Sequence, residues 1–279
     1  MEELAIMKPH TTDLEFLEQV SNDPSWLAGE KFDGYRELWY INADRNELIS
    51  SGGNSHIAGL PQFQQGIPEL AGTVLDCEGM APTRRIEDNA ACFKSRDAVE
   101  WQRQHGWATL VVFDILVKNG ELVVDYPFEY RRKLLEEVFA KIQSPYAKLE
   151  VLVAENKLQY FYKVVADGGE GVVLKHRQGH YAMGKRSDAW LKLKRFETTA
   201  ATIVGALEGT GQFQGLVGSL EVVTENGCRS WVSGMTFEER VYITKNFSSF
   251  LGKKIRVGYQ QTTSAGALRH PRWLGLVEE

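Results

Sequence analysis

The stretch Glu30-Lys31-Phe32-Asp33-Gly34-Tyr35-Arg36 decides how this chain is interpreted, because it places a lysine near the end of an expected strand. Asp33-Gly34 is a turn signal, so we expect the chain to reverse there into a second strand over residues 36–41. An ordinary lysine is protonated at neutral pH, but nearby cations or burial favour the neutral amine, which is a nucleophile. By itself, the stretch is better explained as a surface lysine beside a hairpin turn.

Length and composition indicate a folded chain of one or two domains. The chain has 279 residues, of which 43% are hydrophobic, enough for one large domain or for a medium domain and a small one. The net charge of −5 argues weakly against a nucleic-acid partner, although phosphate binding needs only a local basic face. Such a face is expected near the C-terminus, where basic residues gather at Lys253, Lys254, Arg256, Arg269 and Arg272.

Cysteine usage and the apolar stretches bear on the compartment. Cys77, Cys92 and Cys228 are widely spaced and form no C-x-x-C, so neither a disulfide framework nor a Cys-rich zinc site is expected. The start, Met1-Glu2-Glu3, lacks the features of a signal peptide. The best apolar stretch, residues 109–116, is too short to span a bilayer. We therefore expect a protein of the cytoplasm, of a bacterium or of the host of a virus, with no membrane partner.

Periodicity predicts a mixed first part of the chain. Strands are expected from Trp26 and over residues 36–41, 47–51, 74–79, 108–116, 172–176 and 189–194. Asn119-Gly120 is a strong hairpin-turn signal after the fifth of these. Helices are expected over residues 13–20, 96–104, 127–142 and 155–166.

The character of the sequence changes after Phe196. Short strands over residues 202–206, 220–224, 229–233 and 254–259 are linked by Gly-rich turns, with one helix over residues 237–247. This order is typical of a small β-barrel, with an OB-fold as the obvious candidate. We place the domain boundary so that the first domain covers residues 1–195 and the second covers residues 196–279.

Six stretches together resemble the motifs of the covalent nucleotidyltransferases, which comprise ATP-dependent DNA ligases, RNA ligases and mRNA capping enzymes. K-x-D-G-x-R at Lys31 resembles motif I. The others follow in the family's order as motifs III, IIIa, IV and V and the start of motif VI, at residues 76–79, 112–116, 170–175, 190–194 and 268–272. The resemblance implies an α+β fold, in which an adenylation domain of antiparallel sheets with flanking helices precedes a C-terminal OB-fold β-barrel.

The family roles carry over to matching positions. The resemblance implies that Lys31 is the nucleophile, that Glu78 holds the ribose and that the Phe113 ring stacks on adenine. Lys175, Lys192 and Lys194 would act together with Lys31 as catalytic cations. Glu30 and Arg36 would complete the pocket for ATP. Glu170 and Glu78 would hold Mg²⁺, for which Mn²⁺ could substitute. DNA contacts would come from Asp33, Arg36, Lys253, Lys254, Arg256, Arg269 and Arg272.

Within the superfamily, the sequence favours an ATP-dependent DNA ligase that seals nicks in duplex DNA through a Lys–AMP adduct and a 5′-adenylated DNA. The form of motif V and the segment from Leu268 to Pro271 support this choice. An RNA ligase is the alternative, and a non-catalytic OB-fold binding module is the alternative from another class. Three scattered cysteines oppose an NAD-dependent ligase with a four-Cys zinc module. The short segment before Trp26 suggests a minimal, monomeric ligase of the bacteriophage or bacterial accessory type.

Two departures from the family pattern remain. Motif Ia usually reads S-R-x-G, whereas here Ser50-Ser51-Gly52-Gly53 places a serine where the arginine is expected. The last residues, 275–279, lack the lysine that follows motif VI in many relatives. Orientation of the pyrophosphate would then rest on Arg269 and Arg272.

Overall fold

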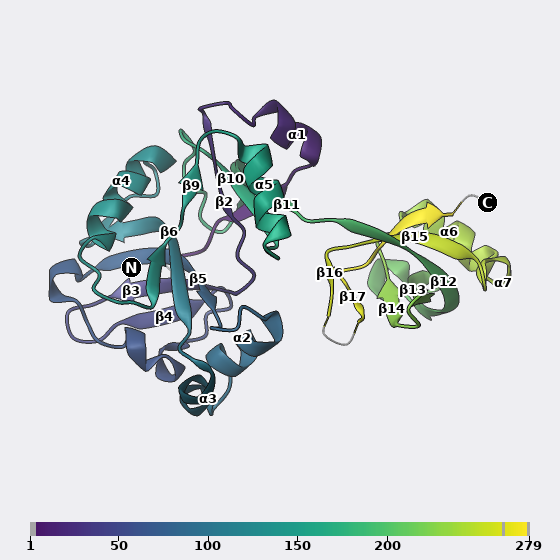
Figure 1. The fold of residues 1–279 in the computed structure, drawn as a ribbon, viewed down its shortest axis with the longest axis horizontal. Helices are drawn as coiled ribbons and strands as arrows, with labels where there is room; N and C mark the ends of the chain where they lie inside the picture. The colour runs from purple at the N-terminus through teal and green to yellow at the C-terminus, as the bar shows by residue number, and fades with distance from the viewer. Residues whose placement is uncertain (1–3, 264–265, 278–279) are drawn as a thin grey trace. The chain divides into compact units, whose positions relative to one another are not determined.

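The computed structural model describes residues 4–263 and 266–277, and the chain divides into two compact units, residues 1–193 and residues 194–279 (Figure 1). This division falls two residues before the boundary expected from the sequence. Among the described residues, no helix is long and apolar enough to cross a membrane.

The first unit contains two sheets. One has the strand order β1-β11-β10-β2-β9, formed by Lys8–Thr11, Arg186–Lys194, Gly171–His176, Trp26–Glu30 and Leu152–Val153. The other has the order β4-β3-β5-β6-β7, formed by Glu47–Ser50, Tyr35–Ile41, Thr73–Met80, Thr109–Lys118 and Glu121–Leu122. Strand β8 (Ala147–Leu149) pairs with β6 in parallel, and β1 pairs with β11 in parallel. The sequence did not predict these two short parallel strands.

Within the described part of this unit, five helices accompany the two sheets: α1 (Leu14–Gln19), α2 (Ile86–Phe93), α3 (Ala98–His105), α4 (Phe128–Phe139) and α5 (Lys157–Ala166). Three 3-10 turns, η1 (Ile57–Gly59), η2 (Pro61–Phe63) and η3 (Pro68–Leu70), connect β4 to β5. Helix α1 begins where the sequence predicts, because the Asp13 carboxylate accepts a hydrogen bond from Phe16 N–H at 2.9 Å. Helix α2 was not predicted, since Arg85 at its start makes no side-chain cap.

Three apolar clusters arrange the first unit in layers. One cluster lies on one face of the β4–β7 sheet and includes Leu135 and Val138 of α4. A second lies between the two sheets, where Trp190 of β11 meets Leu38 of β3. A third packs α1 and α5 on the remaining face of the β2–β10 sheet (Figure 1). The two sheets therefore face each other, with helices covering their outer faces.

The second unit is a small barrel, as the sequence predicts. Its sheet has the order β14-β13-β12-β15-β18, formed by Arg229–Val232, Val217–Thr224, Glu197–Glu208, Lys254–Tyr259 and Arg272–Leu276. A bridge between Ser233 and Arg272 brings the two edges of this sheet together. The remaining elements are η4 (Gly211–Phe213), α6 (Phe237–Lys245), α7 (Phe247–Phe250) and the hairpin β16 (Gln261–Thr262) and β17 (Leu268–Arg269).

Candidate active site

A cavity of about 210 Å³ has walls from both sheets of the first unit. Seven of the residues expected in the nucleotide site line it: Glu30, Lys31, Arg36, Glu78, Phe113, Lys175 and Lys192. These residues are far apart in the sequence and come from six different strands or the turns beside them. The pairing of the strands therefore brings together, at one cavity, residues that lie far apart in the order of the motifs along the chain.

Lys31 lies directly after β2, at the wall of this cavity. Its backbone N–H donates to the Gly171 carbonyl at 2.8 Å, so the end of β2 is held against the start of β10. Its Nζ lies 2.5 Å from Glu170 Oε2. The Lys31 side chain is 20% exposed, whereas that of Glu170 is 5% exposed. The amine is thus held by a buried carboxylate while remaining open to a ligand.

The turn after Lys31 depends on a close approach to β5. A Cβ on Gly34 would lie 2.1 Å from the Gly79 carbonyl oxygen, which leaves space only for glycine. The Gly34 N–H donates to Glu78 Oε1 at 3.0 Å. The Asp-Gly turn predicted from the sequence therefore also fixes the carboxylate expected to hold the ribose.

Glu78 has an unusual electrostatic environment. Burial raises the pKa of Glu78 to about 7, and the charges of Arg36 and Lys31 oppose this shift. The carboxylate consequently titrates close to neutral pH. Any cation that binds beside it would favour its ionised form.

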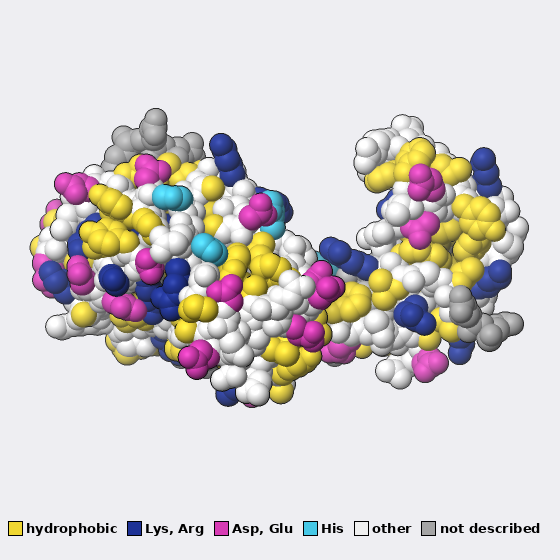
Figure 2. Space-filling view, turned by 90° about the horizontal axis from the view of Figure 1, so that it is seen from above, with side chains coloured by type: hydrophobic (Ala, Val, Ile, Leu, Met, Phe, Trp, Pro, Cys, Tyr) yellow, Lys and Arg dark blue, Asp and Glu magenta, His cyan; other side chains and the backbone are white. Residues whose placement is uncertain are grey.

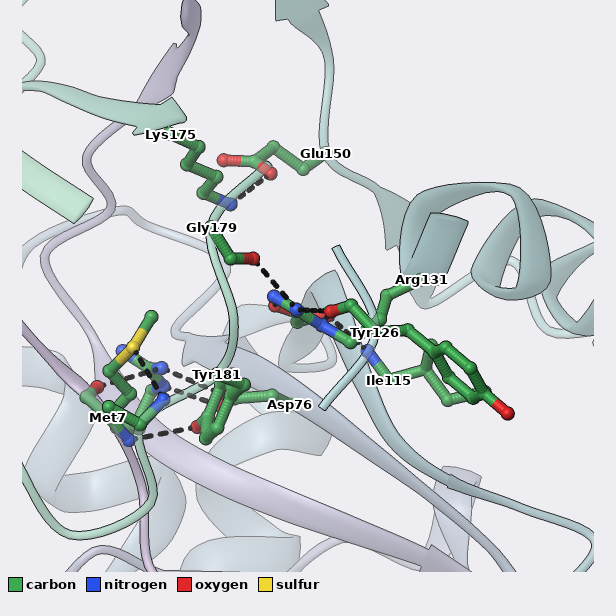
Figure 3. A network of polar contacts seen from close by, with 12 residues as sticks. Met7, Asp76, Ile115, Tyr126, Arg131, Glu150, Lys175, Gly179 and Tyr181 are labelled. Carbon is green, nitrogen blue, oxygen red and sulfur yellow. Dashed lines mark hydrogen bonds and ion pairs between the residues drawn. The ribbon is translucent and has the colours of Figure 1, made fainter. Parts of the chain in front are cut away.

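Arg36 forms the floor of the site together with Asp76. Its Nε and Nη2 donate to the two carboxylate oxygens of Asp76 at 2.5 and 2.6 Å. Tyr181 O–H donates to Asp76 Oδ2 at 2.5 Å and accepts from Met7 N–H at 3.0 Å (Figure 3). The Arg36 guanidinium is therefore fixed by a bidentate ion pair that is itself anchored.

Phe113, expected as an adenine platform, is packed against cations. Arg36 Cζ lies 4.4 Å from the centre of its ring, and Lys175 Nζ lies 4.8 Å from it. The ring lines the cavity but is only 6% exposed. It thus forms a rigid apolar wall whose orientation is held by cation–π contacts.

Lys175 is buried in an ion pair. Its Nζ donates to Glu150 Oε2 at 2.5 Å, and both side chains are 2% exposed (Figure 3). Burial lowers the pKa of Lys175 and raises the pKa of Glu150, while each partner opposes the shift of the other. Trp190 and Phe128 also face the ammonium, with ring centres 4.7 and 5.3 Å from Nζ.

The remaining predicted residues belong to the second unit or to the turn after Lys31. Lys194 is the first residue of the second unit. Lys254 and Arg256 share the exposed face of β15, with Lys253 just before them, whereas Arg272 lies opposite Gly258 near the other end of that strand. Arg269 is in β17, and Asp33 accepts a hydrogen bond from Asn89 at its backbone carbonyl. On the face shown in Figure 2, the basic side chains of the second unit are scattered and not gathered in one patch.

The motifs missed three charged residues of the cavity wall: Lys8, Glu150 and Arg186. Arg186 precedes the strand predicted from residue 189. Trp190 and Lys192 are two positions apart, and continuing this spacing of two towards the N-terminus would have included Arg186. Lys8 and Glu150 lie in or beside short strands with no distinct pattern.

Comparison with known proteins agrees with this geometry. Residues 8–194 match the family described as the ATP dependent DNA ligase domain, and residues 208–276 match the DNA ligase OB-like domain. The chain belongs to the ATP-dependent DNA ligase family. This ligase-family chain is 27% identical over 300 residues to a DNA ligase of Methanococcoides burtonii, with 94% of this chain and 53% of the relative covered.

Two further similarities extend the comparison. A DNA ligase of Thermococcus fumicolans is 26% identical, with 89% of this chain and 51% of that protein covered. The ligase-family chain therefore spans about half the length of these curated relatives. A solved structure described as a study of Lig E DNA ligases has the same fold, with a TM-score of 0.78, 21% identity and coverage of 98% of this chain and 99% of that one.

Proposed function

We propose that this protein is an ATP-dependent DNA ligase that carries AMP on Lys31 and uses it to seal nicks in duplex DNA. The observation that carries the proposal is the position of Lys31 Nζ, at the wall of a cavity that also contains Arg36, Glu78 and Phe113. Membership of the ATP-dependent DNA ligase family supports the same chemistry.

In the first step, Lys31 Nζ forms a bond to the α-phosphorus of ATP while the bond to the pyrophosphate oxygen breaks. The amine loses a proton in this step, and Glu170 Oε2, at 2.5 Å, is placed to accept it. The 5′-phosphate at a nick then takes AMP from Lys31, and attack by the 3′-hydroxyl releases AMP. Each step is a displacement at phosphorus, so positioning and charge neutralisation supply most of the catalysis.

The other residues of the site bind and orient the nucleotide in this proposal. Glu78 accepts hydrogen bonds from the ribose hydroxyls, and Phe113 provides an apolar wall for the base. The other residues proposed for the ATP site are Glu30, Arg36, Lys175 and Lys192, which line the cavity, and Lys194, which begins the second unit. The positive charge of Arg36 and Lys192 attracts the triphosphate.

Glu78 and Glu170 are suited to hold Mg²⁺. Mg²⁺ is held by one or two carboxylates and keeps several waters, so two carboxylates near Lys31 fit its requirements. The ability of Glu78 to titrate near neutral pH also suits a carboxylate that takes up a cation. When bound, the metal would neutralise charge on the α-phosphate and on the leaving pyrophosphate.

The DNA partner in this proposal is a nicked duplex. In this proposal the first unit contributes Asp33, in the turn after Lys31, and Arg36, and the second unit contributes Lys253, Lys254, Arg256, Arg269 and Arg272. An OB-like barrel with exposed cations can follow a phosphate backbone. Sealing should consequently weaken as the salt concentration rises.

The decisive experiment incubates the purified protein with α-labelled ATP and Mg²⁺, after stripping any bound AMP with pyrophosphate. Lys31→Ala should form no covalent adduct, whereas the exposed Lys133→Ala on α4 should label like the wild type. GTP and NAD should give no label. If stripped wild-type protein takes no label from ATP, the proposed activity is wrong.

The substrate is tested with the same pair of variants. Nicked duplex DNA should be sealed much faster than duplexes with RNA at the nick. An RNA ligase would show the opposite preference. Lys31→Ala should still seal DNA that already carries the 5′-adenylate, since only the first two steps need the amine. Failure of folded Lys31→Ala on that substrate would contradict the assigned role.

A further inference from the structure

Glu150 is a carboxylate of the cavity that no motif accounts for. It lies between β8 and β9, is 3% exposed and lines the cavity beside Lys175. Its backbone is held from two sides: its N–H donates to the Val112 carbonyl at 2.9 Å, and its carbonyl accepts from Arg132 Nη2 at 2.9 Å. The carboxylate is thus mounted on a fixed point of the fold, which is how residues that bind ligands selectively are supported.

Gly29 provides the space for this carboxylate. Gly29 of β2 pairs with Val173 of β10, and Val173 lines the cavity. Directly opposed residues of an antiparallel pair point to the same face, so a side chain at position 29 would point into the cavity. A Cβ there would lie 2.1 Å from Glu150 Oε1. The Glu150 carboxylate therefore occupies, on the cavity face of β2, the place that a side chain at position 29 would fill.

Glu150 and Lys175 lie at the end of the cavity away from Lys31. Lys31 Nζ pairs with Glu170, which precedes β10, whereas Glu150 Oε1 rests against Gly29, two residues before Lys31 and about 7 Å back along β2 at the usual rise. The α-phosphorus must sit at Lys31 Nζ for AMP transfer. The part of the nucleotide that reaches Glu150 is therefore its base, and the ring of Phe113 lies 4.8 Å from Lys175 Nζ at that end.

The pair offers fixed hydrogen-bonding groups of opposite kind. An ammonium only donates, and an ionised carboxylate only accepts. Oε2 of Glu150 accepts from Lys175 at 2.5 Å, and Oε1, which rests against Gly29, is the oxygen left to accept from a ligand. The 6-amino group of adenine donates, whereas the 6-oxo group of a guanine presents lone pairs to the carboxylate.

We propose that Glu150 determines base specificity by accepting a hydrogen bond at Oε1 from the 6-amino group of adenine. This inference rests on the proposed transfer of AMP from ATP to Lys31. It makes Gly29 a second specificity determinant, because only a residue without a side chain leaves room for the carboxylate.

The test removes first the 6-amino group of the nucleotide and then the carboxylate of Glu150. ATP is compared with purine riboside triphosphate, which lacks only the 6-amino group, by the initial rate of adduct formation at low nucleotide concentration. Wild-type protein should prefer ATP by roughly 10- to 100-fold, as expected for a hydrogen bond to a charged group. In Glu150→Ala this preference should fall to below about 3-fold, because the acceptor for the 6-amino group is missing.

A second variant changes no charged group. In Gly29→Ala, the new Cβ must displace the Glu150 carboxylate, so the preference for ATP should fall as in Glu150→Ala even though Glu150 is present. Glu137→Gln, an exposed carboxylate on α4, is the matched control and should keep the wild-type preference.

The outcomes separate this inference from the proposed function. If Glu150 only holds Lys175 in place, both nucleotides lose rate equally and the preference for ATP is unchanged, which overturns the inference while adduct formation itself stands. If wild-type protein forms no adduct with ATP, the proposed function fails first. A folded Gly29→Ala variant with the full wild-type preference would also refute the role of Glu150.

Discussion

Replacing Arg131 by methionine should destabilise the first unit strongly. Arg131 and Asp114 are both fully buried, and Arg131 donates from Nε and Nη2 to the two oxygens of Asp114 at 2.9 and 2.8 Å. Its Nη1 donates to the carbonyls of Tyr126 and Gly179 at 2.6 and 3.1 Å. The variant would therefore leave a buried carboxylate without its ion-pair partner and remove the Arg131 donor from the Tyr126 carbonyl, whereas the Gly179 carbonyl would still accept from Phe128 N–H at 2.9 Å.

The magnitude follows from the burial of the pair. Breaking a buried ion pair by removing one partner costs about 3–5 kcal/mol, because an uncompensated charge remains. For a unit of this size, 1 kcal/mol corresponds to about 2–4 °C in Tm, so a fall of roughly 6–20 °C is expected. Differential scanning calorimetry of wild-type protein, Arg131→Met and the exposed control Lys133→Met would measure it.

A double variant makes the reasoning refutable. If the cost comes from the stranded Asp114 carboxylate, Arg131→Met with Asp114→Leu should recover much of the loss, since apolar replacements of buried pairs are often neutral. A fall in Tm of less than about 2 °C for Arg131→Met would show that the pair is not a major source of stability. A double variant no more stable than the single one would show that lost packing, and not stranded charge, dominates.

Three further predictions concern other parts of the chain. Burial raises the pKa of Glu78 from 4.5 to about 7, so between these pH values the folded protein keeps a proton that the unfolded chain has released. The contribution of Glu78 to the free energy of unfolding should therefore fall as pH rises from 4.5 to about 7. In Glu78→Gln, this decrease of the free energy of unfolding with pH should be absent. Lys157 Nζ lies within hydrogen-bond distance of four backbone carbonyls, of Val20, Ser21, Asp23 and Ala154, which share its three donors. Lys157→Met should therefore lower the free energy of unfolding by about 1–3 kcal/mol in urea, and an unchanged value would contradict this. Thr236 and Glu239 form a capping box at α6, so Thr236→Ala should cost the second unit about 1 kcal/mol by calorimetry, whereas Thr236→Ser should cost little.

Local sequence signals predicted most elements of both units. Hydrophobic periodicity and turn residues predicted β2 to β6, α4 and α5 within a few residues of their observed bounds. These patterns depend only on the residues within a single helix or strand. The hairpin at Asn119-Gly120 is an example: both residues have positive φ, at 51° and 87°, as the turn type requires. Helix α2 and the short strands β1, β8 and β9 carry no such local signal and were missed.

The sequence by itself also selected the side chains that are proposed to do the chemistry. The order of the motifs selected Lys31, Glu78, Phe113, Lys175 and Lys192, and the structure places all five around one cavity. A motif match depends only on residue types and their order along the chain. It therefore identifies residues of a family pattern without regard to the distances between them in space. Only tertiary structure could show how they are held and by what.

Tertiary structure decided the contacts between segments distant in the chain. Glu150 and Lys175 are 25 positions apart, and Arg36 and Asp76 are 40 apart, yet each pair is in direct contact. The placement of Glu150 depends on a glycine in a third segment, Gly29, which by sequence is only a small residue in a strand. Such contacts follow from strand pairing and from the facing of two sheets, which no local pattern encodes, and they set the charge state and selectivity of the site.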